Sequence, residues 1–168
     1  TEIKMLHAYG WEESNFPENW VNDFNTYLDG ITVMSKFVKK TLIDNGVHIP
    51  IKICGLGVDH LDSIKNTKFN LSKAKTFKFL HISSCFPRKG IDILLKAYGQ
   101  EFTIQNDVSL IIKTFKNPHN EVRDLLIEYQ NKFSNYPHVI IIEDEFSDTQ
   151  LKGLYNSSDV LIAPSYGE

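Results

Sequence analysis

The sequence predicts an α/β fold, a doubly wound parallel sheet preceded by αβ units from the end of a first domain. Two observations carry this prediction. From residue 77 onward, short apolar runs alternate with polar loops and with stretches of helical spacing, which is the order of elements in a parallel sheet. The run at residues 140–142 is apolar on successive positions, which is typical of a strand covered by helices on both faces.

The chain begins with a strand, a loop and a helix of the first domain. The strand is expected to end near residues 5–8, and a loop rich in aromatic and acidic residues follows at 9–13. The next segment has helical spacing of its large apolar residues, Trp20, Phe24 and Leu28. In the loop, Tyr9 and Trp11 could stack on a sugar, but packing against this helix is the leading interpretation.

A second αβ unit follows at once. Residues 31–34 are strand-like, and Ser35 is a good N-cap because its hydroxyl can accept a free N–H group from the first turn of a helix. Gly46 is expected just beyond the end of that helix, where a left-handed conformation is common. Residues 49–54 give a further short strand, and the first domain is expected to span residues 1–62.

The second domain is expected to span residues 76–168, after an exposed connection at 63–75, which is mostly polar. It opens with a β-rich run at 77–82. The next apolar residues share one face of a helix, at Ile91, Leu94, Leu95 and Tyr98. A second strand at 108–112 and a helix through 122–133 follow.

The last predicted unit starts with a strand at 139–142. Ser147 and Gln150 have the spacing of a capping box before a helix that carries Leu151, Leu154 and Tyr155. A final strand, 160–163, ends at Pro164. We expect the chain to be a piece of a longer protein, because it starts inside an apolar run and stops just after this strand.

Composition excludes several classes of function. The 18 Lys and Arg residues against 21 Asp and Glu give a net charge of -3, so there is no global electrostatic case for nucleic acid. No apolar run approaches the ~20 residues that a membrane-spanning helix needs. Two cysteines, Cys54 and Cys85, cannot form a disulfide framework and favour a reducing compartment. We expect a cytoplasmic protein, and peripheral attachment to the inner face of the membrane stays open.

Ligands of doubly wound sheets bind beyond the carboxyl ends of the strands. The loops at 83–90, 113–120, 143–147 and 165–168 should therefore lie along one edge of the sheet. Any chemistry of this domain is expected there.

Two adjacent cations, Arg88 and Lys89, precede Gly90 at the predicted start of a helix. The free N–H groups and the dipole of a helix N-terminus favour an anion, and the cationic side chains can reach a phosphate. The alternative is that both are solvated cations of a loop. Lys113, at a strand end, could meet the same phosphates or simply be exposed. The chain has neither a P-loop nor a G-x-G-x-x-G fingerprint, so no motif supports an ATPase or a dinucleotide-dependent dehydrogenase.

Glu168 closes a second loop, which begins at Pro164. A carboxylate can accept hydrogen bonds from sugar hydroxyls, so a cationic loop and an acidic loop at one edge suit a nucleotide sugar. The alternative is an ordinary exposed acid. The histidines and cysteines have no spacing that suits a metal, and no metal is expected.

Several blocks of the sequence resemble a known family. Residues 86–98 and 154–168 resemble the donor-binding domain of retaining glycosyltransferases with the GT-B fold, of the group-one or family-four type. Residues 16–20, 31–38 and 57–59 resemble the last units of the acceptor-side domain of these enzymes and the crossing into the donor domain. The resemblance covers nearly the whole chain.

This resemblance implies roles for individual residues. Lys89 would contact the donor diphosphate and stabilise the charge of the leaving group, and Glu168 would bind the sugar as the first Glu of a paired motif; these are the expected catalytic residues. The family's diphosphate-binding arginine falls on Ser83, a departure, and Arg88 or Lys113 could supply the missing charge. The residues expected to contact the donor are Ser83, Ser84, Arg88, Lys89, Lys113, Phe146, Tyr166, Gly167 and Glu168.

The activity implied is hexosyl transfer from a nucleotide-diphosphate sugar to a glycan or lipid-linked acceptor, with retained anomeric configuration and without a cofactor, as in polysaccharide biosynthesis. The loop 143–147 matches the region where the nucleoside base packs. Alternatives are an inactive glycosyltransferase-like binding or structural module, a nucleotide-sugar epimerase or a phosphorylase, and a receiver-like signalling domain, for which residues 80–84 lack clustered aspartates. By itself, this piece is expected to be inactive.

Overall fold

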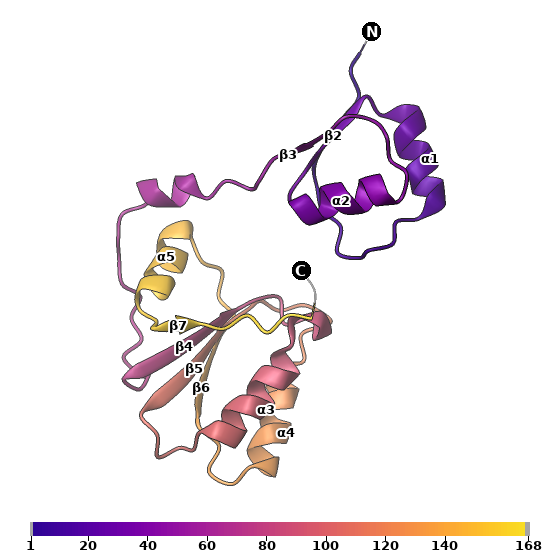
Figure 1. Cartoon of the computed structure of the whole chain (residues 1–168). Coiled ribbons are helices and arrows are strands. Elements are labelled where there is room, and N and C mark those ends of the chain that lie inside the picture. Colours follow the sequence, from indigo (N-terminus) through magenta and orange to yellow (C-terminus); the bar gives the residue numbers. More distant parts are fainter. Residues whose placement is uncertain (1, 167–168) are drawn as a thin grey trace. The chain divides into compact units, whose positions relative to one another are not determined.

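The computed structural model describes residues 2–166 and divides into two compact units, Thr1–Asp59 and His60–Glu168 (Figure 1). Both are α/β units in which every strand pair is parallel. The parallel sheets confirm the fold class that the sequence predicts.

The first unit is a three-stranded sheet of order β1-β2-β3. Its strands are β1 (Met5–Tyr9), β2 (Gly30–Val33) and β3 (Ile51–Ile53), and its helices are α1 (Glu18–Tyr27) and α2 (Lys36–Asp44). Ile31 of the central strand is fully buried and pairs with Leu6 on one side and Ile51 on the other. The buried core of the unit consists of Phe16, Val21, Ile31, Val33, Val38, Leu42 and Val47.

The predicted ends of α2 are confirmed. The hydroxyl of Ser35 accepts a hydrogen bond from the N–H group of Val38 at 3.2 Å, as an N-cap does. Gly46 follows the helix with φ of 99°, and the N–H group of Val47 donates back to the carbonyl of Leu42 at 2.9 Å. Local chemistry therefore sets both ends of this helix.

The aromatic residues of the first unit pack on one another. The ring centre of Trp11 lies 5.0 Å from the ring centre of Phe16 and 5.7 Å from that of Trp20, in edge-to-face arrangements. The ring of Tyr9 lies 5.4 Å from that of Phe24 in the same manner. These contacts favour the packing interpretation of Tyr9 and Trp11.

The second unit is a four-stranded sheet of order β6-β5-β4-β7. Its strands are β4 (Phe77–Ile82), β5 (Val108–Lys113), β6 (His138–Ile142) and β7 (Val160–Leu161). Its α-helices are α3 (Ile91–Glu101), α4 (Val122–Lys132) and α5 (Asp148–Asn156). A 3-10 helix, Asp59–Ser63, begins at the last residue of the first unit, and another, Pro87–Lys89, precedes α3. The predicted capping box of Ser147 and Gln150 is present at the start of α5.

Helices cover both faces of this sheet. Helices α3 and α4 lie on one face and α5 lies on the other (Figure 1). Leu110 and Ile112 of β5 belong to the core beneath α3 and α4, whereas Ile111 packs with Leu154 of α5. All three β5 residues are fully buried, which is the pattern of a strand between two helical layers. The run of β6 is half-buried, because β6 is an edge strand of the described sheet. Its successive residues still pack against the cores on both faces of the sheet, as the apolar run predicted.

The segment 63–75 differs from the exposed connection that its polarity suggested. Its apolar residues Phe69, Leu71 and Ala74 pack against the core on the α5 face. The N–H group of Phe69 donates to the carbonyl of Gly153 at 3.1 Å, and the side chain of Lys152 donates to the carbonyls of Leu61, just before the segment, and Ile64, within it. The lysines and asparagines of the segment are exposed, but its alternate apolar side chains fasten it to the second unit.

Candidate functional site

The strand order of the second unit places a topological switch point between β4 and β7. The chain moves from β4 through β5 to β6 on one side, and then crosses to β7 on the other side of β4. In open α/β sheets, ligands bind in the crevice outside the carboxyl ends of the strands at such a point. The loops after β4 and after β7 are the two that the sequence singled out.

The loop after β4 ends in a 3-10 turn, Pro87–Lys89, and not directly in a helix. Gly90 follows with φ of 67° and ψ of 28°, and α3 begins one residue later at Ile91. Arg88 and Lys89 therefore lie in a tight turn in front of the helix, with the N–H group of Lys89 bonded to the carbonyl of Phe86 at 2.8 Å. The left-handed residue reorients the backbone between turn and helix.

The loops after β4 and β7 touch each other. The N–H group of Tyr166 donates to the carbonyl of Arg88 at 2.8 Å. A Cβ atom on Gly90 would lie 2.2 Å from the carbonyl oxygen of Pro164, so only glycine allows this approach. Among the predicted site residues, the structure thus brings together Arg88, Lys89 and Tyr166; Gly167 and Glu168 lie outside the described residues.

A second group of predicted residues gathers at the end of β5. The N–H group of Ser83 donates to the carbonyl of Lys113 at 3.2 Å. The ammonium of Lys113 donates to the carbonyl of Thr114 at 2.8 Å and lies 5.0 Å from the ring centre of Phe146. The carbonyl of Ser84 accepts a hydrogen bond from the side chain of Asn117. Lys113 therefore points toward the loop 143–147 that was expected to hold the base.

The hydroxyl of Ser83 is engaged inside the protein. Its Oγ lies 2.8 Å from Nε2 of His81 and accepts a hydrogen bond from the N–H group of Cys85 at 3.0 Å. Ser83 thus differs in kind from the arginine that the family resemblance implies at this position, because its hydroxyl bonds within the loop itself. Burial raises the pKa of the Cys85 thiol, which makes this buried cysteine a poor nucleophile.

Sequence reasoning did not find the ion pair beside this site, because its partners are 20 residues apart and have no motif. Nε and Nη2 of Arg123 both donate to Oε2 of Glu143, the residue just after β6, with Nε at 3.2 Å. This hydrogen bonding by Arg123 lowers the pKa of Glu143 below its ordinary value, and the positive charges of Arg123 and Lys116 act in the same direction.

We expect Arg123→Met to raise the pKa of Glu143 toward that of a free glutamate. Because the folded-state pKa is lowered, the pair stabilises the fold above the unfolded pKa, and this contribution is lost as the pH falls through the folded pKa. NMR titration of the Glu143 carboxyl group measures the change, and Lys132→Met at the other end of α4 is the control. An unchanged titration in Arg123→Met would contradict the role of this pair.

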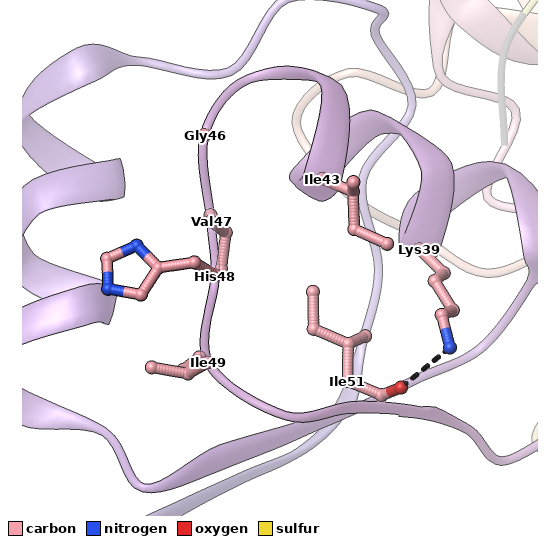
Figure 2. Close-up of a pocket in the computed structure, with 7 residues that line it drawn as sticks. All are labelled: Lys39, Ile43, Gly46, Val47, His48, Ile49 and Ile51. Carbon is pink, nitrogen blue, oxygen red and sulfur yellow. Dashed lines mark hydrogen bonds between the residues drawn. The ribbon is translucent and has the colours of Figure 1, made fainter.

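Two pockets lie elsewhere among the described residues. One of about 290 Å³ lies beside the loop after β4, between the starts of α3 and α4, and its lining includes His119, Glu121 and Tyr166. The other, of about 390 Å³, lies between α2 and β3 in the first unit (Figure 2). Its lining is mostly aliphatic, and the ammonium of Lys39 is bonded to the carbonyl of Ile51 at 2.9 Å. The His48 ring points away from Ile43 and Ile51. It lacks the convergent polar groups of a binding site.

Residues 2–166 offer neither a metal cluster nor a membrane-spanning helix. No group of three or more His, Cys, Asp and Glu side chains in this range converges on a common point. No helix in the same range is long and apolar enough to cross a membrane.

No family model and no curated protein matches the chain. Sucrose-phosphate synthase from Thermosynechococcus elongatus matches with a TM-score of 0.62 and 16% identity over 89% of this chain and 39% of that one. The chain shares the α/β fold of the matched part of that protein. OtsA in its apo form matches with a TM-score of 0.58 and 12% identity over 90% of this chain and 45% of that one.

The chain therefore spans less than half the length of either solved structure. At these identities the likeness shows the fold: Rossmann-like α/β units with parallel sheets. The fold was predictable from the order of strands and helices, and the GT-B resemblance in the sequence pointed the same way.

Proposed function

We propose that this chain contributes the donor-binding site of a glycosyltransferase. The enzyme would transfer a hexose from a nucleotide-diphosphate sugar to a glycan or lipid-linked acceptor and retain the anomeric configuration. One observation carries the proposal: the loop with Arg88 and Lys89 and the loop with Tyr166 meet at the switch point of a doubly wound sheet. The fold shared with sucrose-phosphate synthase supports it.

The chemistry of the two loops suits such a donor. A diphosphate that leaves the sugar gains negative charge, and Lys89 and Arg88 are the cations of the loop at the switch point. Glu168, which follows the Tyr166 loop in the sequence, would accept hydrogen bonds from sugar hydroxyls. Lys113 beside Phe146 would lie toward the nucleoside end. The proposed reaction needs no metal and no cofactor.

We expect Lys89→Met to weaken the binding of UDP or GDP roughly 10- to 100-fold, because a hydrogen bond to a charged group contributes about 1.5–3 kcal/mol. Isothermal titration calorimetry of the chain measures the affinity. Lys96→Met is the matched control, since Lys96 is an exposed lysine on α3 away from the loop. Equal affinities of Lys89→Met and the unmodified chain would contradict the proposed site.

A second candidate is an inactive module that keeps the fold. The engaged hydroxyl of Ser83, in the place of the family's arginine, favours it. This candidate predicts that the whole protein binds neither UDP nor GDP. Binding of either nucleotide would reject it.

A further inference from the structure

A buried histidine lies on the strand that leads into the proposed site. His81 is on β4, two residues before Ser83, and is 1% exposed. Its Nδ1 atom lies 2.9 Å from the carbonyl oxygen of Ile162, in the segment that follows β7. Its Nε2 atom lies 2.8 Å from the hydroxyl oxygen of Ser83. One ring therefore joins the loop after β4 to the segment after β7, on the two sides of the switch point.

The partners of the ring assign its protons. A carbonyl oxygen can only accept, so Nδ1 of His81 carries the hydrogen that reaches Ile162. The hydroxyl of Ser83 already accepts from the N–H group of Cys85 at 3.0 Å and needs an acceptor for its own hydrogen. Nε2 at 2.8 Å is a far better acceptor than the Cys85 sulfur at 3.7 Å. The geometry thus favours a neutral ring with the hydrogen on Nδ1.

These bonds hold a turn that the backbone does not favour by itself. Cys85 has φ of 52°, a left-handed conformation that is uncommon for residues other than glycine. The Ser83 hydroxyl accepts a hydrogen bond from the N–H group of Cys85 and so holds this residue in place. The 3-10 turn with Arg88 and Lys89 begins two residues later. The orientation of Ser83 in turn depends on Nε2 of His81.

We propose that His81 is a positioning residue of the diphosphate site: through Ser83 it fixes the turn that presents Arg88 and Lys89. The identity of the ligand, a diphosphate, rests on the proposed function. The hydrogen bonds of His81 do not depend on that function. It also assigns Ser83 a structural role in the loop, as the link between His81 and Cys85, in place of a direct phosphate contact.

Two substitutions separate the halves of the bridge. In His81→Gln, the side-chain oxygen can reach the place of Nε2 and accept from Ser83. In His81→Asn, the amide nitrogen can take the place of Nδ1 and donate to Ile162, but nothing replaces the acceptor for Ser83. The same sheet offers a matched control, a second Ser–His pair. Nδ1 of His138 lies 2.8 Å from the hydroxyl oxygen of Ser109. This pair lies at the starts of β6 and β5, whereas the proposed site lies beyond the carboxyl ends of the strands.

The experiment combines NMR with calorimetry. Long-range ¹H–¹⁵N spectra of the unmodified chain should show His81 neutral with its hydrogen on Nδ1. Exchange of the Cys85 amide hydrogen should be faster in His81→Asn than in His81→Gln. The affinity for UDP or GDP should fall about tenfold in His81→Asn, recover in His81→Gln and stay unchanged in His138→Gln.

A ring with its hydrogen on Nε2 alone would overturn the proposal, as would equal Cys85 exchange in the two His81 variants. Equal affinities of His81→Asn and the unmodified chain would also overturn it. If the unmodified chain binds neither nucleotide, the proposed function fails, and the proton on His81 and the Cys85 exchange still decide the positioning role. The spectrum of the unmodified chain gives this answer even where a variant does not fold.

Discussion

Replacing Gly90 with alanine is expected to destabilise the second unit by about 2–4 kcal/mol, as the sum of a left-handed conformation and a steric overlap. The φ angle of 67° is costly for any residue with a Cβ atom. The new atom would lie 2.2 Å from the carbonyl oxygen of Pro164, so the junction of the two site loops has to move apart. We therefore expect weaker nucleotide binding in the molecules that stay folded.

Denaturant unfolding can assign this effect to one unit. Both tryptophans, Trp11 and Trp20, lie in the first unit, so tryptophan fluorescence follows that unit alone. Amide hydrogen exchange of β5 reports on the second unit. Gly90→Ala should speed this exchange and leave the fluorescence transition in place. Gly55→Ala is the control, because a Cβ atom at Gly55 meets nothing within 4 Å.

Slow exchange of β5 in Gly90→Ala, equal to that of the unmodified chain, would show that the two loops do not meet as described.

Leu95→Ala is expected to destabilise the second unit by about 2–5 kcal/mol, because it removes buried methyl groups and leaves a cavity. Leu95 is fully buried in the core between α3 and the sheet, together with Leu110 and Tyr98. Its carbonyl also accepts a hydrogen bond from the hydroxyl of Tyr136 at 2.6 Å. Packing and a buried hydrogen bond therefore both hold the helix at this point.

The neighbouring residue gives the control for this substitution. Lys96→Ala changes an exposed side chain of the same helix and should leave the free energy of unfolding nearly unchanged. Hydrogen exchange of β5 amides again reports the difference. Similar stabilities of Leu95→Ala and Lys96→Ala would contradict the packing of α3 on the sheet.

Much of the fold was predictable because the signals are local. The cap at Ser35, the capping box of Ser147 and the glycine after α2 each depend on residues within one turn of a helix. The β-rich run at 77–82 matches β4, and its neighbour in the sheet follows from the αβ order. These features needed no knowledge of distant contacts.

The rest depends on residues far apart in the sequence. The approach of Gly90 to Pro164, the bridge of His81 to Ile162 and the pair of Arg123 with Glu143 join positions that no spacing rule connects. The polar residues of segment 63–75 suggested an exposed connection, but the apolar residues between them pack on the second unit. The site loops were predictable as places on a sheet edge, but their mutual contact required the structure.

The central claim is that a nucleotide diphosphate binds where the loops after β4 and β7 meet. Titration of the ¹⁵N-labelled chain with UDP and with GDP tests it most directly. The account predicts that one of them shifts the amide signals of residues 83–90 and 164–166 and leaves those of the first unit's pocket at Lys39 and Ile51 in place. No shift with either nucleotide, or shifts confined to the first unit, would contradict it.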